Sequence, residues 1–193
     1  MSDVARCRWC EAHPLLQEYH DTEWGLPAAD DRRQFEHHVL EIFQAGLNWL
    51  TMLKKREALR EAFAGFNPTR IARFGDKEIQ RLLNDARIIR NRSKIAAVIN
   101  NAPLFIRVSE EFGGFHRFLE GFQPPRPRVR RRESQIPAQT KEAEALSKEL
   151  KRRGFKFVGP TICYAHMQAV GIVNDHIASC HRFEAINELM VHR

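Results

Sequence analysis

Long apolar runs are absent from this chain of 193 residues. No stretch approaches the roughly 18 uninterrupted apolar residues that a membrane-spanning helix needs. The first residues, MSDVARCRWC, also lack the apolar core of a signal peptide. These absences predict a soluble cytoplasmic protein that has no membrane partner.

Cysteine is scarce, with four residues in the whole chain. Cytoplasmic thiols are kept reduced, so we do not expect disulfides. Metal binding, chemistry and simple burial remain as the roles to weigh for these side chains.

Sustained alternation of apolar and polar residues is absent too, so nothing in the pattern indicates β-strands. Helical spacing is present instead. In residues 30–46, Phe35, Val39, Ile42 and Phe43 recur at i, i+4, i+7 and i+8 and form one apolar stripe. The pattern predicts an all-α fold. Further helices are expected over residues 50–63, 67–74, 76–86, 91–112 and 113–122.

Positive charge exceeds negative charge, with 31 Lys and Arg against 24 Asp and Glu and a net charge of +7. A basic balance hints at nucleic acid, although many basic proteins bind none. The charge concentrates in residues 124–137 and 148–157. Prolines and five arginines make the first of these an irregular connection, which either contacts DNA or is simply solvated.

Residues 141–172 read as a helix, a tight hairpin that holds Gly154 and Gly159, and a second helix that begins at Pro160. Lysines and arginines surround the turn. The backbone N–H groups of such a hairpin can bind a phosphate. An ordinary helical hairpin with a solvated basic face fits this segment equally well.

Cysteines and histidines gather near both ends of the chain. His176 and Cys180 are four residues apart, which on a helix would place them on one face. Together with the N-terminal cluster they allow a Cys2His2 set of Cys7, His20, His176 and Cys180, or a Cys3His set with Cys10 in place of His20. Either would be a structural zinc site that ties the termini together, and spacing slightly favours Cys10.

Several motifs together resemble the 3-methyladenine DNA glycosylase I family: CRW, YHDTEWGLP, LEIFQAGLNWLTMLKKRE, IIRNRSKIAAVINNA and ALSKELKRRGFKFVGPTICYAHMQAVGIVNDH. The likeness runs in order from about residue 7 to residue 180. It implies an all-α helix-hairpin-helix fold of two helical lobes, with residues 1–193 as a single catalytic unit.

The resemblance also implies an activity, which is base-excision repair of double-stranded DNA that carries alkylated bases. The enzyme would hydrolyse the N-glycosidic bond of 3-methyladenine, release the base and leave an abasic site. No lysine nucleophile is evident in the motifs, so no strand cleavage is expected. We expect a monomer in the cytoplasm, associated with the nucleoid through its substrate.

The substrate sets the chemistry of the site. Methylation at N3 makes the adenine cationic and weakens its glycosidic bond, so the flipped base needs aromatic faces and a carboxylate more than a strong acid. The resemblance places Trp9, Tyr19 and Trp49 among the aromatic residues and Glu41 as the catalytic carboxylate. Whether Glu41 acts as an electrostatic stabiliser or a general base is open, and Trp24 is taken as a core residue.

The resemblance assigns the remaining positions as follows. The structural zinc ion would be held by Cys7, His20, His176 and Cys180, which makes Cys10 a spare. The expected DNA contacts are Gly46 and Leu47 beside the flipped nucleotide and the hairpin residues Lys156, Gly159 and Thr161. Leu16 stands where other members carry a pocket tyrosine. Ile42, Phe43 and His166 are further departures.

Two other interpretations compete with the enzyme. A non-catalytic binder or sensor of alkylated or abasic DNA could use the same fold, and the changes at Leu16 and Ile42 make this conceivable. A purely structural domain held by zinc would show no salt-dependent DNA binding at all.

Overall fold

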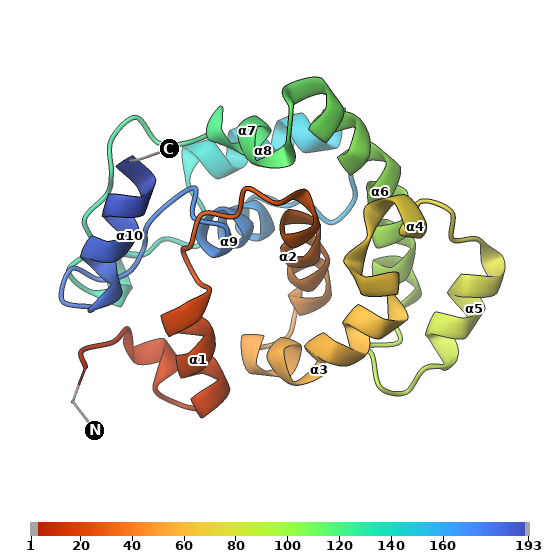
Figure 1. Ribbon diagram of the computed structural model, residues 1–193, viewed down its shortest axis with the longest axis horizontal. Coiled ribbons are helices and arrows are strands. Elements are labelled where there is room, and N and C mark those ends of the chain that lie inside the picture. Colours follow the sequence, from red (N-terminus) through yellow and green to blue (C-terminus); the bar gives the residue numbers. More distant parts are fainter. Residues whose placement is uncertain (1–3, 192–193) are drawn as a thin grey trace.

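A computed structural model describes residues 4–191 of the chain and shows that they are helical (Figure 1). No β-strand occurs between residues 4 and 191, where the one bridge outside the helices joins Arg130 to Ile177. The α-helices are α1 (Pro14–Thr22), α2 (Asp31–Gln44), α3 (Trp49–Ala62), α4 (Pro68–Ile71), α5 (Asp76–Asn84), α6 (Arg92–Phe112), α7 (Phe115–Glu120), α8 (Lys141–Arg152), α9 (Pro160–Ala169) and α10 (Arg182–Val191). The all-α prediction is confirmed.

Side chains fix where several helices begin. Asp30, Asn48, Asn67, Asn91 and Thr140 each accept a hydrogen bond from the third backbone N–H of the helix that follows. These caps satisfy backbone donors that have no partner inside the helix.

Helix α2 runs through the middle of the molecule and packs against α3, α6, α7 and α9 (Figure 1). Its apolar stripe of Phe35, Val39, Ile42 and Phe43 is fully buried in the main hydrophobic core. Because α2 is surrounded, Glu41 at the edge of this stripe is buried too. A second, smaller cluster lies where α1 and α9 approach the ends of the chain. It comprises Cys7, Tyr19, Trp24, Ala169 and Cys180.

One local prediction is wrong. His176 and Cys180 lie in a turn after α9, since that helix ends at Ala169 and Gly171 then adopts a φ of +70°. The backbone of the turn is held from outside, because the N–H of Ala178 donates to the carbonyl of Arg130. None of the described helices is long and apolar enough to span a membrane.

Candidate functional site

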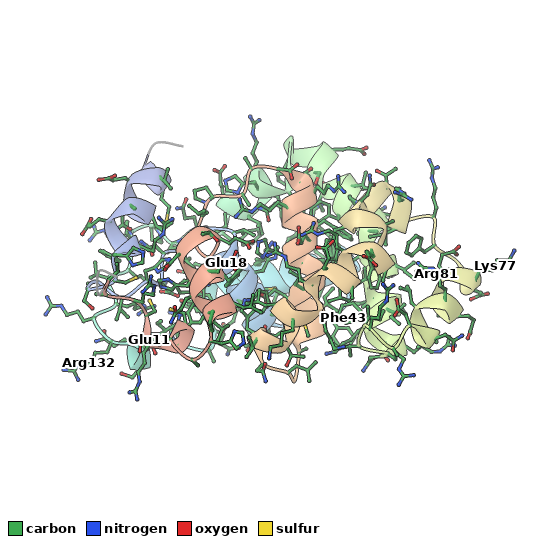
Figure 2. The ribbon with its side chains drawn as sticks, turned by 60° about the horizontal axis from the view of Figure 1, so that its bottom comes forward. Glu11, Glu18, Phe43, Lys77, Arg81 and Arg132 are labelled. Atoms are coloured by element: carbon green, nitrogen blue, oxygen red, sulfur yellow. The ribbon has the colours of Figure 1, made fainter. Side chains whose placement is uncertain are left out.

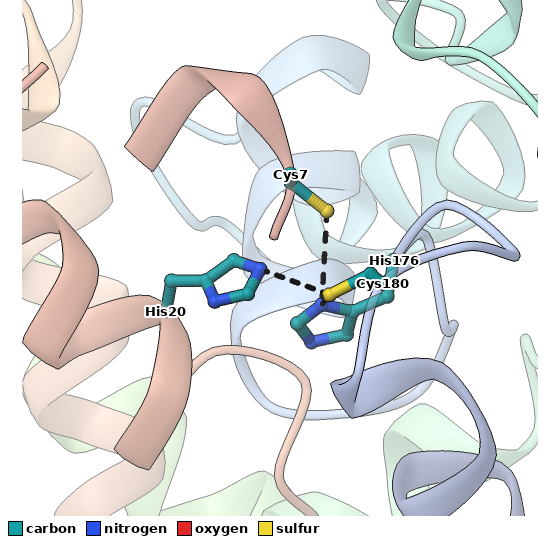
Figure 3. A group of neighbouring side chains, drawn as sticks. All are labelled: Cys7, His20, His176 and Cys180. Carbon is teal, nitrogen blue, oxygen red and sulfur yellow. Dashed lines mark hydrogen bonds between the residues drawn. The ribbon is translucent and has the colours of Figure 1, made fainter. Parts of the chain in front are cut away.

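Four buried side chains from the two ends of the chain converge on one point (Figure 3). Their ligand atoms all lie within 4.8 Å of one another. The Cys180 Sγ is 3.4 Å from His20 Nε2 and 3.5 Å from His176 Nδ1, and the Cys7 Sγ is 3.8 Å from that same Nδ1. Two thiols and two imidazoles at this spacing could hold a metal ion.

The surroundings of this cluster orient the donors. His20 donates from Nδ1 to Asp21 at 2.8 Å, and Asp21 in turn receives two hydrogen bonds from the Arg6 Nε and one from its Nη2. His176 donates from Nε2 to the Trp24 carbonyl at 3.1 Å. The other nitrogen of each ring is therefore left bare and faces the centre, as metal-binding histidines require.

The two thiols differ in pKa. A hydrogen bond from Cys7 lowers the pKa of Cys180, while the pKa of Cys7 is raised. Cys10 stays outside the cluster, since its Sγ donates to the Cys7 carbonyl at 3.0 Å. The spacing argument that favoured Cys10 is thus wrong, and the set with His20 is the one that the fold brings together.

A cavity of about 250 Å³ lies beside this cluster. All three tryptophans of the chain line it, and two of their contacts show how tightly the aromatic rings pack. The rings of Tyr19 and Trp49 are 5.1 Å apart, and those of Trp9 and Trp24 are 5.2 Å apart. The full lining is Trp9, Tyr19, Trp24, Glu41, Gln44, Trp49, Ile136, Ala165 and Gln168.

Glu41 is the acidic group of the cavity. Only 4% of it is exposed, and no hydrogen bond or ion pair joins its carboxyl to another residue of the range 4–191. Burial raises the pKa of Glu41 to about 8. Tyr19 has a pKa well above its usual value, mainly through burial and then through Glu41, so it stays neutral. The buried Nε1 of Trp49 also has no hydrogen-bond partner in the described part of the chain. The cavity therefore keeps one acid and one donor free for a ligand.

The metal cluster and the cavity share walls. The Trp24 ring lies 4.5 Å from the His176 ring, and the Trp9 ring lies 5.5 Å from the His20 ring. Trp9 and Trp24 thus each contact a candidate metal ligand and also line the cavity. A metal ion that holds the ligands in place would therefore also hold these two walls of the cavity.

Most predicted pocket residues line the cavity, but not all of them. Leu16 is buried and lies outside the lining, as do Ile42 and Phe43 in the main core. His166 is also outside it, with its Nε2 3.0 Å from Gln34 Oε1. These four side chains therefore pack around the cavity and do not form its lining.

The structure adds lining residues that sequence reasoning did not identify. Gln44 could have been found, because it follows Glu41 by one helical turn on α2. Trp24 had been assigned to the core alone. Ile136, Ala165 and Gln168 reach the cavity from distant segments, and no local pattern marks them.

The arginine-rich segment 124–137 closes one side of this cavity. Ile136 lines it, and Glu133 Oε1 accepts a hydrogen bond from the Trp9 N–H at 3.1 Å. Two of the five arginines are held in ion pairs, Arg128 by Glu142 and Arg130 by Asp175. Arg132 instead projects away from the ribbon (Figure 2).

The residues expected to touch DNA lie in two loops. Gly46 follows α2 with a φ of +81°, and Leu47 beside it is 42% exposed. Lys156 and Thr161 are exposed around the turn between α8 and α9, where Gly159 precedes the first residue of α9.

Comparison with known proteins gives one consistent result. The methyladenine glycosylase family model matches residues 9–183. DNA-3-methyladenine glycosylase 1 of Escherichia coli K12 is 46% identical over 92% of this chain and 96% of its own. The DNA-3-methyladenine glycosylase of Haemophilus influenzae is 40% identical over 92% and 97%.

Solved structures agree with the sequence relatives. The 3-methyladenine DNA glycosylase I of Staphylococcus aureus, solved to explain its recognition of 3-methyladenine, superposes with a TM-score of 0.86 at 33% identity. The match covers 92% of this chain and 96% of that one. With the family model spanning most of the sequence, this chain belongs to the methyladenine glycosylase family.

Proposed function

We propose that this protein is a DNA-3-methyladenine glycosylase, which releases 3-methyladenine from alkylated DNA and leaves an abasic site. The observation that carries the proposal is Glu41, a buried carboxyl in an aromatic cavity that has no hydrogen-bond partner among the described residues. Its family relatives bear the same activity in their names.

The cavity suits a flipped cationic base. Aromatic rings present negative faces to a delocalised cation, and Trp9, Tyr19 and Trp49 supply such faces. Glu41 is neutral while the cavity is empty at pH 7, because its pKa is about 8. A bound cation stabilises the carboxylate, so Glu41 loses its proton and becomes the counter-charge.

Hydrolysis then needs little acid catalysis. The bond between C1′ and N9 breaks, and its electron pair neutralises the positive base, which leaves without taking up a proton. The oxygen of a water molecule bonds to C1′ and releases its proton to solvent. No lysine lines the cavity, so an amine adduct at C1′ and the strand cleavage that follows it are not part of the proposal.

We assign the metal cluster to one structural zinc ion held by Cys7, His20, His176 and Cys180. The donors fit, because two thiols and two oriented imidazoles form a tetrahedral zinc set. Zinc would supply a fixed link between the two termini and no chemistry at the base. The protein's own contribution is to place Trp9 and Trp24 against the ligands.

The loop at Gly46 and Leu47 and the turn between α8 and α9 would make the DNA contacts. Leu47 is an exposed apolar side chain that would fill the gap left by the flipped nucleotide, next to the backbone at Gly46. The N–H groups of Gly159 and Thr161, with the Lys156 charge, would bind backbone phosphate. We expect a monomer that acts on double-stranded DNA in the cytoplasm, within the nucleoid.

A base-release assay tests the proposal. Wild-type protein is expected to release 3-methyladenine from methylated duplex DNA, and Glu41→Gln is expected to release it about a hundredfold more slowly while remaining folded. Binding to abasic or methylated DNA without release would instead identify a damage sensor. If the protein shows no salt-dependent DNA binding at all, the interpretation as a purely structural domain is the one that remains.

A further inference from the structure

Helix α6 carries two buried polar side chains on one face. Lys94 is 6% exposed and Asn101, about two turns later, is fully buried. Neither lines the cavity or belongs to the metal cluster. Burying an ammonium and an amide costs free energy unless their polar atoms have hydrogen-bond partners. Those partners identify the backbone segments that the two side chains hold in place.

Lys94 holds the end of α2. Its Nζ donates to the carbonyl of Phe43 at 2.8 Å and to that of Ala45 at 2.6 Å. These carbonyls belong to the last turn of α2 and to its cap, where a positive charge is favourable. The next residues are Gly46, with its φ of +81°, and Leu47. The ammonium therefore fixes the backbone from which the apolar side chain of Leu47 projects.

Asn101 holds the turn between α8 and α9. Its Oδ1 accepts from the Lys156 N–H at 2.8 Å, and its Nδ2 donates to the Lys156 carbonyl at 2.9 Å. The same Nδ2 is 2.9 Å from Nε2 of His38 on α2. The preceding residue, Asn100, donates to the Gly154 carbonyl at 3.0 Å.

This clamp counters backbone strain. Phe157, the residue after the clamped peptide, has a φ of +54°, which costs free energy for a bulky side chain. The clamp turns the Lys156 carbonyl inward. Ser147 does the same for the Val158 carbonyl, which its Oγ contacts at 2.6 Å. With those acceptors held inside, the N–H groups at the start of α9 are left to face an anion.

We propose that Lys94 and Asn101 are positioning residues that fix the Gly46–Leu47 loop and the Lys156 turn at the separation that damaged duplex DNA requires. The proposal rests on the proposed function, because it takes both loops as DNA contacts. Both side chains lie on α6, so this one helix contacts both loops. Neither side chain touches DNA, since both are buried under the loops that they hold.

The test compares DNA binding with free-base binding. Asn101→Leu removes all of the amide's hydrogen bonds at similar volume, and Lys94→Met removes the ammonium. Each variant is titrated with a duplex that carries a tetrahydrofuran abasic analogue, and separately with free 3-methyladenine. All three tryptophans line the cavity, so their fluorescence reports free-base binding directly.

Matched controls remove similar groups elsewhere. Lys55→Met deletes an ammonium that donates to the Arg87 carbonyl at 2.7 Å, and Asn67→Leu deletes the cap of α4. We expect Lys94→Met and Asn101→Leu to bind the duplex about tenfold more weakly than these controls, a change of about 1.4 kcal/mol. Their affinity for free 3-methyladenine should stay within about twofold of wild type.

Asn100→Ala keeps the test decisive if Asn101→Leu does not fold. Asn100 is exposed, and its substitution removes one bond to the hairpin turn. It should weaken duplex binding by a smaller factor and leave free-base binding unchanged. Duplex affinity equal to that of the controls would overturn the proposal, and so would a parallel loss of free-base affinity. If Leu47→Ala and Lys156→Ala bind the duplex like wild type, the proposed DNA face itself has failed.

Discussion

The metal cluster and the base cavity are neighbours that differ in whether their buried polar groups have hydrogen-bond partners. In the cluster, each imidazole has a second partner, Asp21 for His20 and the Trp24 carbonyl for His176. In the cavity, the Glu41 carboxyl has no hydrogen-bond partner among residues 4–191, and the Trp49 N–H has none there either. Since a buried polar group gains from a partner, these two groups of the cavity are available to a ligand.

The largest expected effect comes from breaking the cluster. Cys7→Ser removes a thiolate ligand and should abolish stoichiometric zinc binding, with a fall in the melting temperature of roughly ten degrees or more, because bound metal contributes directly to folding free energy. Elemental analysis and calorimetry measure both quantities. Cys10→Ser is the matched control and should keep its zinc. A Cys10→Ser variant that loses zinc, beside a Cys7→Ser variant that keeps it, would reverse the ligand assignment.

A smaller effect is expected from the partner of a ligand. Asp21→Asn leaves all four donors in place but removes the carboxylate that orients His20, whose Nδ1 it contacts at 2.8 Å. Loss of such a partner weakens metal affinity by about 10- to 100-fold. Competition with a chelator measures this change. Unchanged affinity would mean that the cluster does not depend on the second partners that distinguish it from the cavity.

In the cavity, replacing the ionisable carboxyl with a neutral amide should stabilise the protein, most of all at high pH. Burial raises the pKa of Glu41 to about 8 from an unfolded value near 4.5, so the fold favours its protonated form. That preference is fully present below pH 4.5 and is lost as pH rises through 8, where a charge must be buried. Glu41→Gln should therefore raise the melting temperature by a few degrees at pH 9 and by less at pH 5.

The surface variant Glu18→Gln provides the control for this measurement, because Glu18 is exposed on α1. It should shift the melting temperature little at either pH. A Glu41→Gln variant that melts below wild type at pH 9 would show that Glu41 has a stabilising partner after all.

The smallest effect concerns a buried polar group outside both regions. Burial, then the charges of His38 and His37, lower the pKa of His166 well below its usual value. Its stability contribution is present above the unfolded pKa near 6.5 and is lost as pH falls. His166→Phe should therefore lose less stability between pH 7 and pH 5 than wild type, as thermal melts at the two values can measure. If both proteins lost equal stability between pH 7 and pH 5, a group other than His166 would cause the acid sensitivity.

The sequence predicted most of the helices, although not α1, α10 or the turn at His176, and it predicted the site only in part. Periodicity and capping residues such as Asp30 predict elements that form from local interactions. The ligand set depends on tertiary packing, and cysteine spacing alone pointed to Cys10. Gln168 and Ile136 reach the cavity only because α9 and the arginine-rich segment meet beside α2, which no local pattern encodes.

The central claim is that the Glu41 carboxylate supplies the negative charge that binds a cationic base in the cavity. It is tested most directly with the 3-methyladenine cation that carries a methyl group at N9, titrated against tryptophan fluorescence from pH 6 to pH 9. Tyr19, the other titratable lining residue, stays neutral across this range. Binding requires Glu41, with its pKa of about 8, to release a proton.

The cation should therefore bind about tenfold more tightly for each pH unit up to pH 8 and then level off. Glu41→Gln should bind it weakly at every pH, and uncharged 9-methyladenine should show no such rise with wild type. A wild-type affinity for the cation that is independent of pH, or unchanged by Glu41→Gln, would contradict the account.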